Sequence, residues 1–293
     1  MTARDPTVSF DRADFRRWFD RQPFRIEHRL CDHPLFGLAR LIELSRALPA
    51  DRVEYNAGTL PITQDPRQTP RTGLSVTETI HRIEECRSWM VLKNVESDAE
   101  YRELGQRCLD PMRELCPDMR APELFVFISS PDAVTPYHID PECNFLLQVR
   151  GTKTMRTFPA RDRSVLSEQE LERFYAGGSR NLLQLTAEAE SKARVFELEP
   201  GQGVHVPVNA PHWVQNGPMV SISFSVTFRT DASDRREIAY RINHRLRQLR
   251  LQPRPVGHSP VVDDVKYALF DAARGLVRAL RSARSGRRAG CAP

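Results

Sequence analysis

The sequence has no long apolar run, few cysteines and few lysines, and each shortage excludes a class of protein. No stretch of about 20 apolar residues is present, so no segment is predicted to be a transmembrane helix. The six cysteines (31, 86, 108, 116, 143 and 291) include no Cys-x-x-Cys pair, which predicts reduced thiols and neither a disulfide framework nor a zinc site. The first 21 residues lack the apolar core of a signal peptide. These absences predict a cytoplasmic protein.

Several common catalytic motifs are also missing. The sequence contains no Gly-x-Ser-x-Gly, no P-loop, no dinucleotide-binding fingerprint and no His-Glu-x-x-His. It contains no nucleic-acid-binding motif either, although a net charge of +5 and a pI near 9.0 permit anionic partners. A chain of 293 residues is long enough for one large domain with appendages.

Lysine is scarce in a chain that is otherwise rich in cations. Of 43 Lys and Arg residues only four are Lys, at positions 93, 153, 192 and 266, so a cationic position is arginine by default. A lysine at 153 is therefore informative. Its ammonium is a compact point charge, which would suit a narrow barrel interior that holds one carboxylate better than the rigid arginine fork. The alternative is an exposed lysine in a hairpin.

A His-x-Asp triplet is the most informative motif present. His138 and Asp140 are two residues apart, and at the end of an extended strand such residues point to the same side. A distant histidine from a neighbouring strand would complete a set of two imidazoles and one carboxylate. That set, with three coordination positions left open, is the facial triad of non-haem Fe(II) oxygenases. By itself the triplet also fits a surface turn whose aspartate caps a local segment.

Two later histidines compete for the third ligand position. His205 lies within a short predicted strand between valines, whereas His212 follows a proline-containing turn and opens the next strand. A ligand is held better at the mouth of a strand, so we favour His212. His205 is expected to line the pocket or to be a core histidine whose hydrogen bonds are satisfied.

Period-two patterns predict the strands around these residues. Residues 144–149 and 153–158 are predicted strands, with a turn at 150–152 that returns the chain. From Val220 to Phe228 apolar residues alternate with serine and threonine, which is typical of a strand. The hydroxyl-bearing face would lie in solvent in an open sheet, or line the interior of a small barrel. The sequence does not separate these two possibilities.

The flanking regions are predicted to be mixed. Before residue 120 we expect helices over 11–20, 35–48, 76–87 and 98–115, strands near 52–56 and 88–93, and a loop over 59–73 that either covers a site or only connects. Ser75 and Ser97 each begin a sequence of capping-box form. A capped helix is expected near 167–176. After Arg229, two basic helices are predicted over 233–250 and 261–283, the second with an apolar stripe and an arginine-rich end at 281–288.

The motif-bearing segments resemble a known family. Residues 135–158 and 200–228 are similar to the Jumonji-C (JmjC) or cupin-like branch of the 2-oxoglutarate-dependent Fe(II) dioxygenases, and most similar to the asparaginyl hydroxylase of the hypoxia response. The matching run is Thr-Pro-x-His-x-Asp-x-x-x-Asn-Phe, then Gln, then Gly-x-Lys; Pro-Gly, Val-x-Val-Pro and His-Trp follow later. The resemblance implies a mainly β protein with a double-stranded β-helix (jelly roll, cupin-like) core, an N-terminal α/β extension and C-terminal helices. We therefore expect a dioxygenase domain over residues 1–230, with the motif core at 121–230, and a basic helical segment over 231–293.

The resemblance also implies roles for individual residues. His138, Asp140 and His212 would be the catalytic Fe(II) ligands. Lys153, helped by Thr135, would bind the distal carboxylate of the co-substrate 2-oxoglutarate. Asn144 would lie beside its chelating end, and Thr227 stands where the hypoxia enzyme has an asparagine. The contact there is less well matched, and Ser225 is the alternative.

These roles predict an enzyme that uses Fe(II), 2-oxoglutarate and O2 to hydroxylate a C–H bond, with release of succinate and CO2. The substrate would be a protein side chain, a peptide or a small metabolite. Two alternatives remain: a non-catalytic cupin-like binding or regulatory protein, and a cupin-type metal-dependent isomerase that would not need Lys153. We also expect part of the C-terminal apolar stripe to lie in a homodimer interface.

Overall fold

The structure is a computed structural model that describes residues 7–289, and for residues 276–289 it describes the helix without its side chains. The chain divides into two compact units. The larger comprises Met1–Leu166 and Ser179–Thr230, and the smaller comprises Ser167–Gly178 and Asp231–Pro293. The smaller unit thus includes a segment from the middle of the chain. The division into a dioxygenase domain over residues 1–230 and a helical segment over 231–293 stays a prediction.

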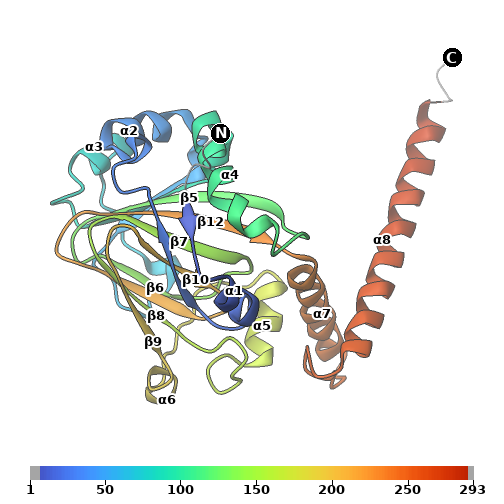
Figure 1. Ribbon diagram of the computed structural model, residues 1–293. Helices are drawn as coiled ribbons and strands as arrows, with labels where there is room; N and C mark the ends of the chain where they lie inside the picture. Colours follow the sequence, from blue (N-terminus) through green and yellow to red (C-terminus); the bar gives the residue numbers. More distant parts are fainter. Residues whose placement is uncertain (1–6, 290–293) are drawn as a thin grey trace. The chain divides into compact units, whose positions relative to one another are not determined.

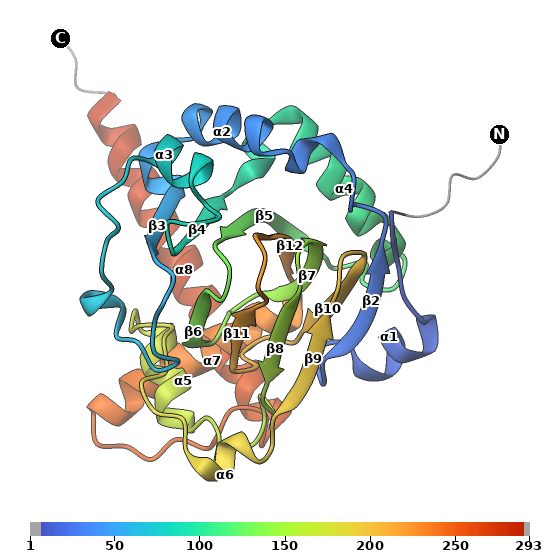
Figure 2. The ribbon, with the colours of Figure 1, turned by 90° about the vertical axis from the view of Figure 1, so that its left-hand side faces the viewer.

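Two antiparallel sheets form the centre of the larger unit (Figures 1 and 2). The eight-stranded sheet has the order β1-β2-β10-β7-β12-β5-β4-β3, and the four-stranded sheet has the order β6-β11-β8-β9. The strands are β1 (Val8–Ser9), β2 (Phe24–His28), β3 (Val53–Ala57), β4 (Ser88–Lys93), β5 (Arg120–Ser129), β6 (Val134–His138), β7 (Cys143–Arg150), β8 (Lys153–Thr157), β9 (Arg194–Leu198), β10 (Gln202–Val206), β11 (His212–Asn216) and β12 (Ser221–Arg229). The predicted mainly β, jelly-roll core with helical additions is confirmed.

The central strands β7 and β12 are buried on both faces. On β12 the apolar residues, such as Phe224, belong to the large core cluster, and the serines between them are also buried. On β7, Phe145 and Leu147 join the same cluster, whereas Asn144 faces the other way. The hydroxyl-bearing face of β12 therefore lines the barrel interior, which settles a question that the sequence left open.

Helices cover the apolar face of the eight-stranded sheet (Figure 2). They are α1 (Arg12–Trp18), α2 (Leu38–Ala47), α3 (Val76–His81) and α4 (Ala99–Arg113). The capping box at Ser75 is present, but α3 ends at His81, earlier than predicted. The box predicted at Ser97 is wrong: Asp98 is the N-cap, and its carboxylate accepts hydrogen bonds from the backbone N–H groups of Glu100 and Tyr101. A carboxylate one residue later satisfies the same free helix N–H groups.

The turn at residues 150–152 joins the two sheets and does not close a hairpin. β7 pairs with β10 and β12, whereas β8 pairs with β11 and β9. The strand predicted at 153–158 is present as β8, but the prediction that it returns along the preceding strand was wrong, because β8 does not pair with β7. A turn motif in the sequence indicates only that the chain changes direction. Which strands then pair depends on which apolar faces are buried in the folded protein.

We predict that Gly151→Ala destabilises the protein more than Gly73→Ala. Both glycines have a left-handed φ, +70° and +75°, in which a side chain is strained. A Cβ at 151 would in addition meet the backbone carbonyl of Val220, whereas nothing lies within 4 Å of a Cβ at 73. Gly151→Ala should lower the free energy of unfolding by about 1–3 kcal/mol, measured by urea denaturation. Equal losses in the two variants would contradict this.

The smaller unit is helical. It contains α5 (Glu168–Tyr175), α7 (Asp231–Gln248) and α8 (Pro260–Ala289); the short α6 (Ala187–Glu190) belongs to the larger unit. The predicted helix near 167–176 is confirmed as α5, with a capping box at Ser167. Within the unit the buried Glu172 accepts a hydrogen bond from Arg247 at 2.7 Å, and the rings of Tyr175 and Tyr240 stack.

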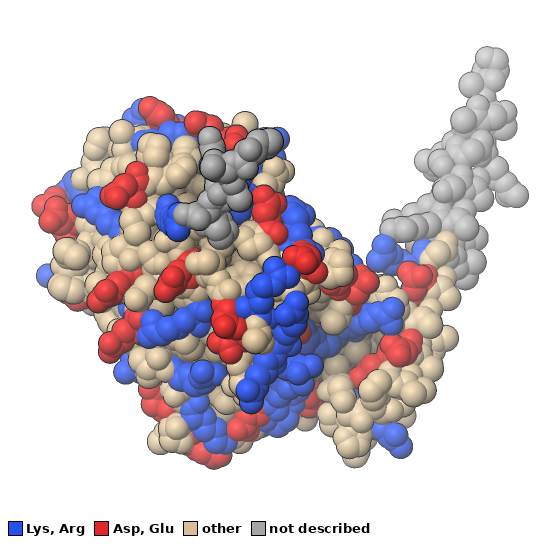
Figure 3. Space-filling view, viewed as in Figure 1, with Lys and Arg blue, Asp and Glu red and all other residues tan. Residues whose placement is uncertain are grey.

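The apolar stripe of α8 is exposed where its side chains are described. Val261, Val265 and Leu269 are 72%, 53% and 67% exposed. Ala272 of the predicted stripe is exposed as well, whereas Leu276, Val277, Leu280 and the arginines at 281–288 lie outside the described side chains. Among residues 7–289 no helix is long and apolar enough to cross a membrane. On the face shown in Figure 3, cationic and anionic side chains are intermixed.

Candidate metal centre and anion pocket

A cavity of about 210 Å³ opens within the larger unit. It is lined by residues of both sheets, among them His138, Asn144 and Lys153. Residues of β3, β4 and β5 also line it, as does the loop that precedes α3, through Leu60, Pro66 and Thr69. The loop over 59–73 is therefore part of the wall of this cavity.

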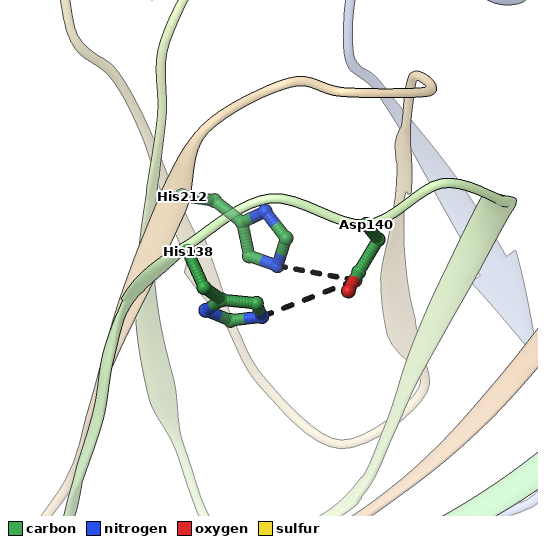
Figure 4. Close-up of side chains that lie close together, drawn as sticks. All are labelled: His138, Asp140 and His212. Carbon is green, nitrogen blue, oxygen red and sulfur yellow. Dashed lines mark ion pairs between the residues drawn. The ribbon is translucent and has the colours of Figure 1, made fainter. Parts of the chain in front are cut away.

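The three predicted metal ligands, which all line the cavity, point toward one another (Figure 4). His138 ends β6, His212 opens the paired strand β11 directly opposite, and Asp140 follows β6 by two residues. Their ligand atoms all lie within 4.8 Å of one another. Asp140 Oδ2 is 3.9 Å from His138 Nε2 and 3.6 Å from His212 Nε2. Within the described part of the chain this is the one such group of His, Cys, Asp and Glu side chains.

Backbone hydrogen bonds orient both imidazoles. His138 Nδ1 lies 2.6 Å from the carbonyl oxygen of Pro136, and His212 Nδ1 lies 2.9 Å from that of Ala210. A carbonyl accepts only, so each Nδ1 carries the hydrogen and each Nε2 presents a lone pair. Burial lowers the pKa of both histidines and keeps them neutral. Neutral imidazoles fixed in this way are the form that binds a metal.

Asp140 remains ionised although it is buried. Burial alone would raise its pKa, but the Arg180 guanidinium and a hydrogen bond from the Asn144 side chain hold the pKa well below its usual value. Arg180 Nη2 lies 2.5 Å from Asp140 Oδ1, which leaves Oδ2 facing the imidazoles. Two neutral nitrogens and one carboxylate oxygen, with open space beside them, fit a divalent ion of the iron group.

His205 lies elsewhere, in the core. Its Nδ1 donates to the carbonyl of Asn144 at 3.1 Å, and its Nε2 accepts from the backbone N–H of Asp20 at 3.2 Å. The ring packs against Phe19, Phe24 and Phe145. Burial lowers the pKa of His205 to about 3. Both ring nitrogens are used, which matches the core histidine that the sequence allowed.

Lys153 provides a buried cation on another wall of the cavity. It begins β8, is 6% exposed, and its Nζ donates to Ser223 Oγ at 2.6 Å. No carboxylate of the described residues contributes to its pKa, which burial lowers to about 7. A cation removed from water in this way requires an anionic or strongly accepting partner. The position therefore suits an anion that enters the cavity.

The other predicted cofactor residues divide into two groups. Thr135 and Asn144 line the cavity, and Asn144 accepts from Ser225 Oγ at 2.7 Å and bonds to Asp140. Thr227 does not line it: its hydroxyl donates to the backbone carbonyl of Glu123 at 3.1 Å. Thr227 is paired with Asn144 in the sheet, but it is the side chain of Ser225, and not that of the preferred Thr227, that hydrogen-bonds to Asn144.

Arg180 is the site residue that the sequence did not reveal. Residues 180–182 run beside the end of β6, because Ile139 N donates to the Arg180 carbonyl and Leu182 N donates to that of Tyr137. This pairing, with a bridge between His138 and Asn181, brings Arg180 over Asp140. Arginine is the common cation of this chain, and no nearby motif distinguishes this one.

A double-stranded β-helix with two imidazoles and a carboxylate on its cavity defines a cupin-type barrel able to hold a metal ion. Residues 74–234 match the model of the cupin-like domain family, and the chain belongs to that family. A comparison with curated proteins gives no match.

Solved structures share the fold. An X-ray structure of ycfD from E. coli is 19% identical with a TM-score of 0.55, over 94% of this chain and 69% of that one. A crystal structure titled Escherichia coli ribosomal oxygenase YcfD is 18% identical with a TM-score of 0.53, over 94% and 68%. A structure of YcfD with cobalt and 2-oxoglutarate is 18% identical with a TM-score of 0.53, over 92% and 68%. At this identity the likeness establishes the fold.

Proposed function

We propose that the chain is a 2-oxoglutarate- and Fe(II)-dependent dioxygenase that hydroxylates a C–H bond. The observation that carries the proposal is the convergence of His138, Asp140 and His212 on one cavity with a buried Lys153 that has no described carboxylate partner. The similar E. coli structure contains cobalt and 2-oxoglutarate, which supports a metal ion and 2-oxoglutarate as the groups bound in this cavity. Iron and 2-oxoglutarate would supply the oxidising chemistry with O2, releasing succinate and CO2.

Each residue of the site has a separate task in this proposal. The two imidazoles and Asp140 Oδ2 hold the metal, and Arg180 neutralises the remaining carboxylate oxygen. Lys153 and Thr135 bind the distal carboxylate of the co-substrate, while Asn144 orients Asp140. The apolar wall of the cavity, including Leu146, Met155 and Val214, excludes water.

We propose a protein side chain or peptide as the substrate. The cavity of about 210 Å³ is smaller than the pockets of roughly 300–1,000 Å³ that enclose whole drug-sized ligands. One similar structure is titled a ribosomal oxygenase, which supports a protein target. The finer resemblance to the asparaginyl hydroxylase of the hypoxia response rests on the motif at residues 135–158 and stays a prediction, as does a cytoplasmic location.

The direct test is succinate formation from 2-oxoglutarate with added Fe(II), with and without candidate peptides. Succinate formation above the metal-free background supports a dioxygenase. Tight binding of metal and 2-oxoglutarate without succinate, under all substrates tried, would favour the non-catalytic cupin-like binding protein. Metal binding without any 2-oxoglutarate binding would favour the cupin-type isomerase.

The affinity for 2-oxoglutarate should fall as the pH rises above about 7. Burial lowers the pKa of Lys153 to about 7, and only its ammonium form attracts a carboxylate. Above that pH binding must take up a proton, so the affinity should fall by up to about tenfold per pH unit. Titration calorimetry with Mn(II)-loaded protein measures this, and Lys153→Met should lack the slope. An affinity that stays flat between pH 7 and 9 would contradict the prediction.

We also propose that a second copy of the chain covers the exposed stripe of α8. Val261, Val265 and Leu269 form an apolar face on one side of this helix. Truncation after Arg229, followed by light scattering, should therefore lower the oligomeric state. A truncated protein that keeps the parent's oligomeric state, solubility and turnover would remove any assembly role for the C-terminal helices.

A further inference from the structure

A buried chain of hydrogen bonds leads through the barrel interior to Lys153. It begins at Gln148 on β7, a fully buried side chain. Gln148 Nε2 donates to the backbone carbonyls of Arg150 and Gly151, at 2.7 and 3.1 Å, and to Ser221 Oγ at 3.0 Å. Carbonyl oxygens accept only, so the orientation of this amide is determined: its Nε2 faces the turn between β7 and β8.

The orientation of the amide determines that of the next hydroxyl. Gln148 Oε1 can only accept, and Ser223 Oγ lies 2.7 Å from it. The single hydrogen of Ser223 is therefore donated to Gln148, and its lone pairs face Lys153 Nζ at 2.6 Å. Ser223 therefore accepts a hydrogen bond from Lys153, and it has no second hydrogen to donate to a ligand in the cavity.

This arrangement holds the ammonium by one of its three donors. Ser223 lies on the eight-stranded sheet and Lys153 on the four-stranded sheet, so the bond also joins the two walls of the cavity. The remaining donors of Lys153 stay available on a residue that lines the cavity. A flexible four-carbon side chain in a buried space would otherwise have several orientations.

We propose that Gln148 and Ser223 form a positioning relay that aims the Lys153 ammonium at the incoming carboxylate of the co-substrate. The proposal rests on the function proposed above, because that function supplies the carboxylate. Neither residue touches the metal ligands, and the neighbouring Ser225 serves a different partner, Asn144. The relay therefore acts on the anion pocket and leaves the metal centre unchanged.

The test compares Ser223→Ala with Ser221→Ala. Both serines lie on the interior face of β12, are at most 1% exposed and bond to Gln148, but only Ser223 bonds to Lys153. In calorimetry on Mn(II)-loaded protein, Ser223→Ala should weaken 2-oxoglutarate binding by about 10- to 100-fold, as expected for the loss of a hydrogen bond to a charged group. Ser221→Ala should change it by less than about threefold, Ser223→Thr should restore binding, and Mn(II) affinity should be the same in all variants.

A second measurement needs neither metal nor co-substrate. The chain has four lysines, so protein labelled with 13C at lysine Cε gives few signals, and Lys153→Met assigns the relevant one. Without the Ser223 acceptor the ammonium is less stable, so the titration midpoint of Lys153 should fall in Ser223→Ala and stay unchanged in Ser221→Ala.

The outcomes separate the relay from the proposed function. Wild-type Lys153 titration together with wild-type 2-oxoglutarate affinity in Ser223→Ala would overturn the relay. Equal effects of the two serine variants would also overturn it, because they would indicate a general loss of packing. If the unaltered protein binds no 2-oxoglutarate, the proposed function fails, and the lysine titration still decides whether Ser223 holds Lys153.

Discussion

Asp140→Ala and His138→Ala are expected to abolish metal-dependent turnover while the fold is kept. Each removes one of three ligands whose donor atoms lie within 4.8 Å of one another. Removing a residue that only supports a ligand typically weakens metal binding by about 10- to 100-fold, and loss of a ligand itself should exceed that. Co(II) absorption and calorimetry would measure metal binding, and circular dichroism would check the fold.

The third ligand has a matched control within the chain. His212→Ala should lose metal binding in the same way, whereas His205→Gln should retain it. His205 is equally buried, but both of its ring nitrogens are bonded to backbone groups in the core. Its replacement should lower the free energy of unfolding by about 1–3 kcal/mol, because the Asp20 N–H or the Asn144 carbonyl loses its partner. Full activity in His212→Ala would show that the third ligand is assigned wrongly.

Lys153→Met should raise the 2-oxoglutarate requirement far more than the iron requirement. Removing one partner of a buried charge pair typically costs about 3–5 kcal/mol, which corresponds to more than about 100-fold in affinity. The metal ligands should be unaffected, since Lys153 bonds to Ser223 and forms no described bond to them. Steady-state turnover against 2-oxoglutarate and against Fe(II) separates the two effects.

Lys153→Arg tests the shape of the cation as well as its charge. The planar guanidinium is larger than an ammonium and has a fixed fork, so in a cavity of about 210 Å³ it should be impaired as well. We expect partial recovery relative to Lys153→Met. An unchanged 2-oxoglutarate dependence in Lys153→Met would mean that this lysine is only a structural residue of the barrel.

The sequence predicted the strands and the placement of His138 beside Asp140 because both depend on local patterns. Residues 220–228 alternate with period two, and His138 and Asp140 have the spacing that places two side chains on one side of an extended chain. His212 could be preferred to His205 because a proline-containing turn precedes His212 and marks it as the start of a strand, whereas His205 lies between valines inside one. These features require no knowledge of distant neighbours.

What the sequence could not predict depends on partners far away in the chain. The serines of β12 are buried only because the four-stranded sheet closes over them, so the same alternation fits an open sheet equally well. The turn at Gly151 was predicted, but whether it closes a hairpin or changes sheets depends on the pairing of β8 with β9 and β11. Arg180 reaches Asp140 across 40 positions of sequence and carries no motif of its own.

The pairing of β2 with β10 has a consequence for how the protein is made. β2 ends at His28 and β10 begins at Gln202, so roughly 170 residues must emerge from the ribosome before the N-terminal strand can find its partner. At about 5–20 residues per second this takes on the order of 10–35 s. Throughout that time Phe24 and Ile26, which are buried in the finished barrel, lack their β10 partner, because β1 pairs only with Glu27 and His28. The nascent chain therefore carries an apolar strand with one edge unpaired during most of its synthesis, and such an edge can pair with other chains.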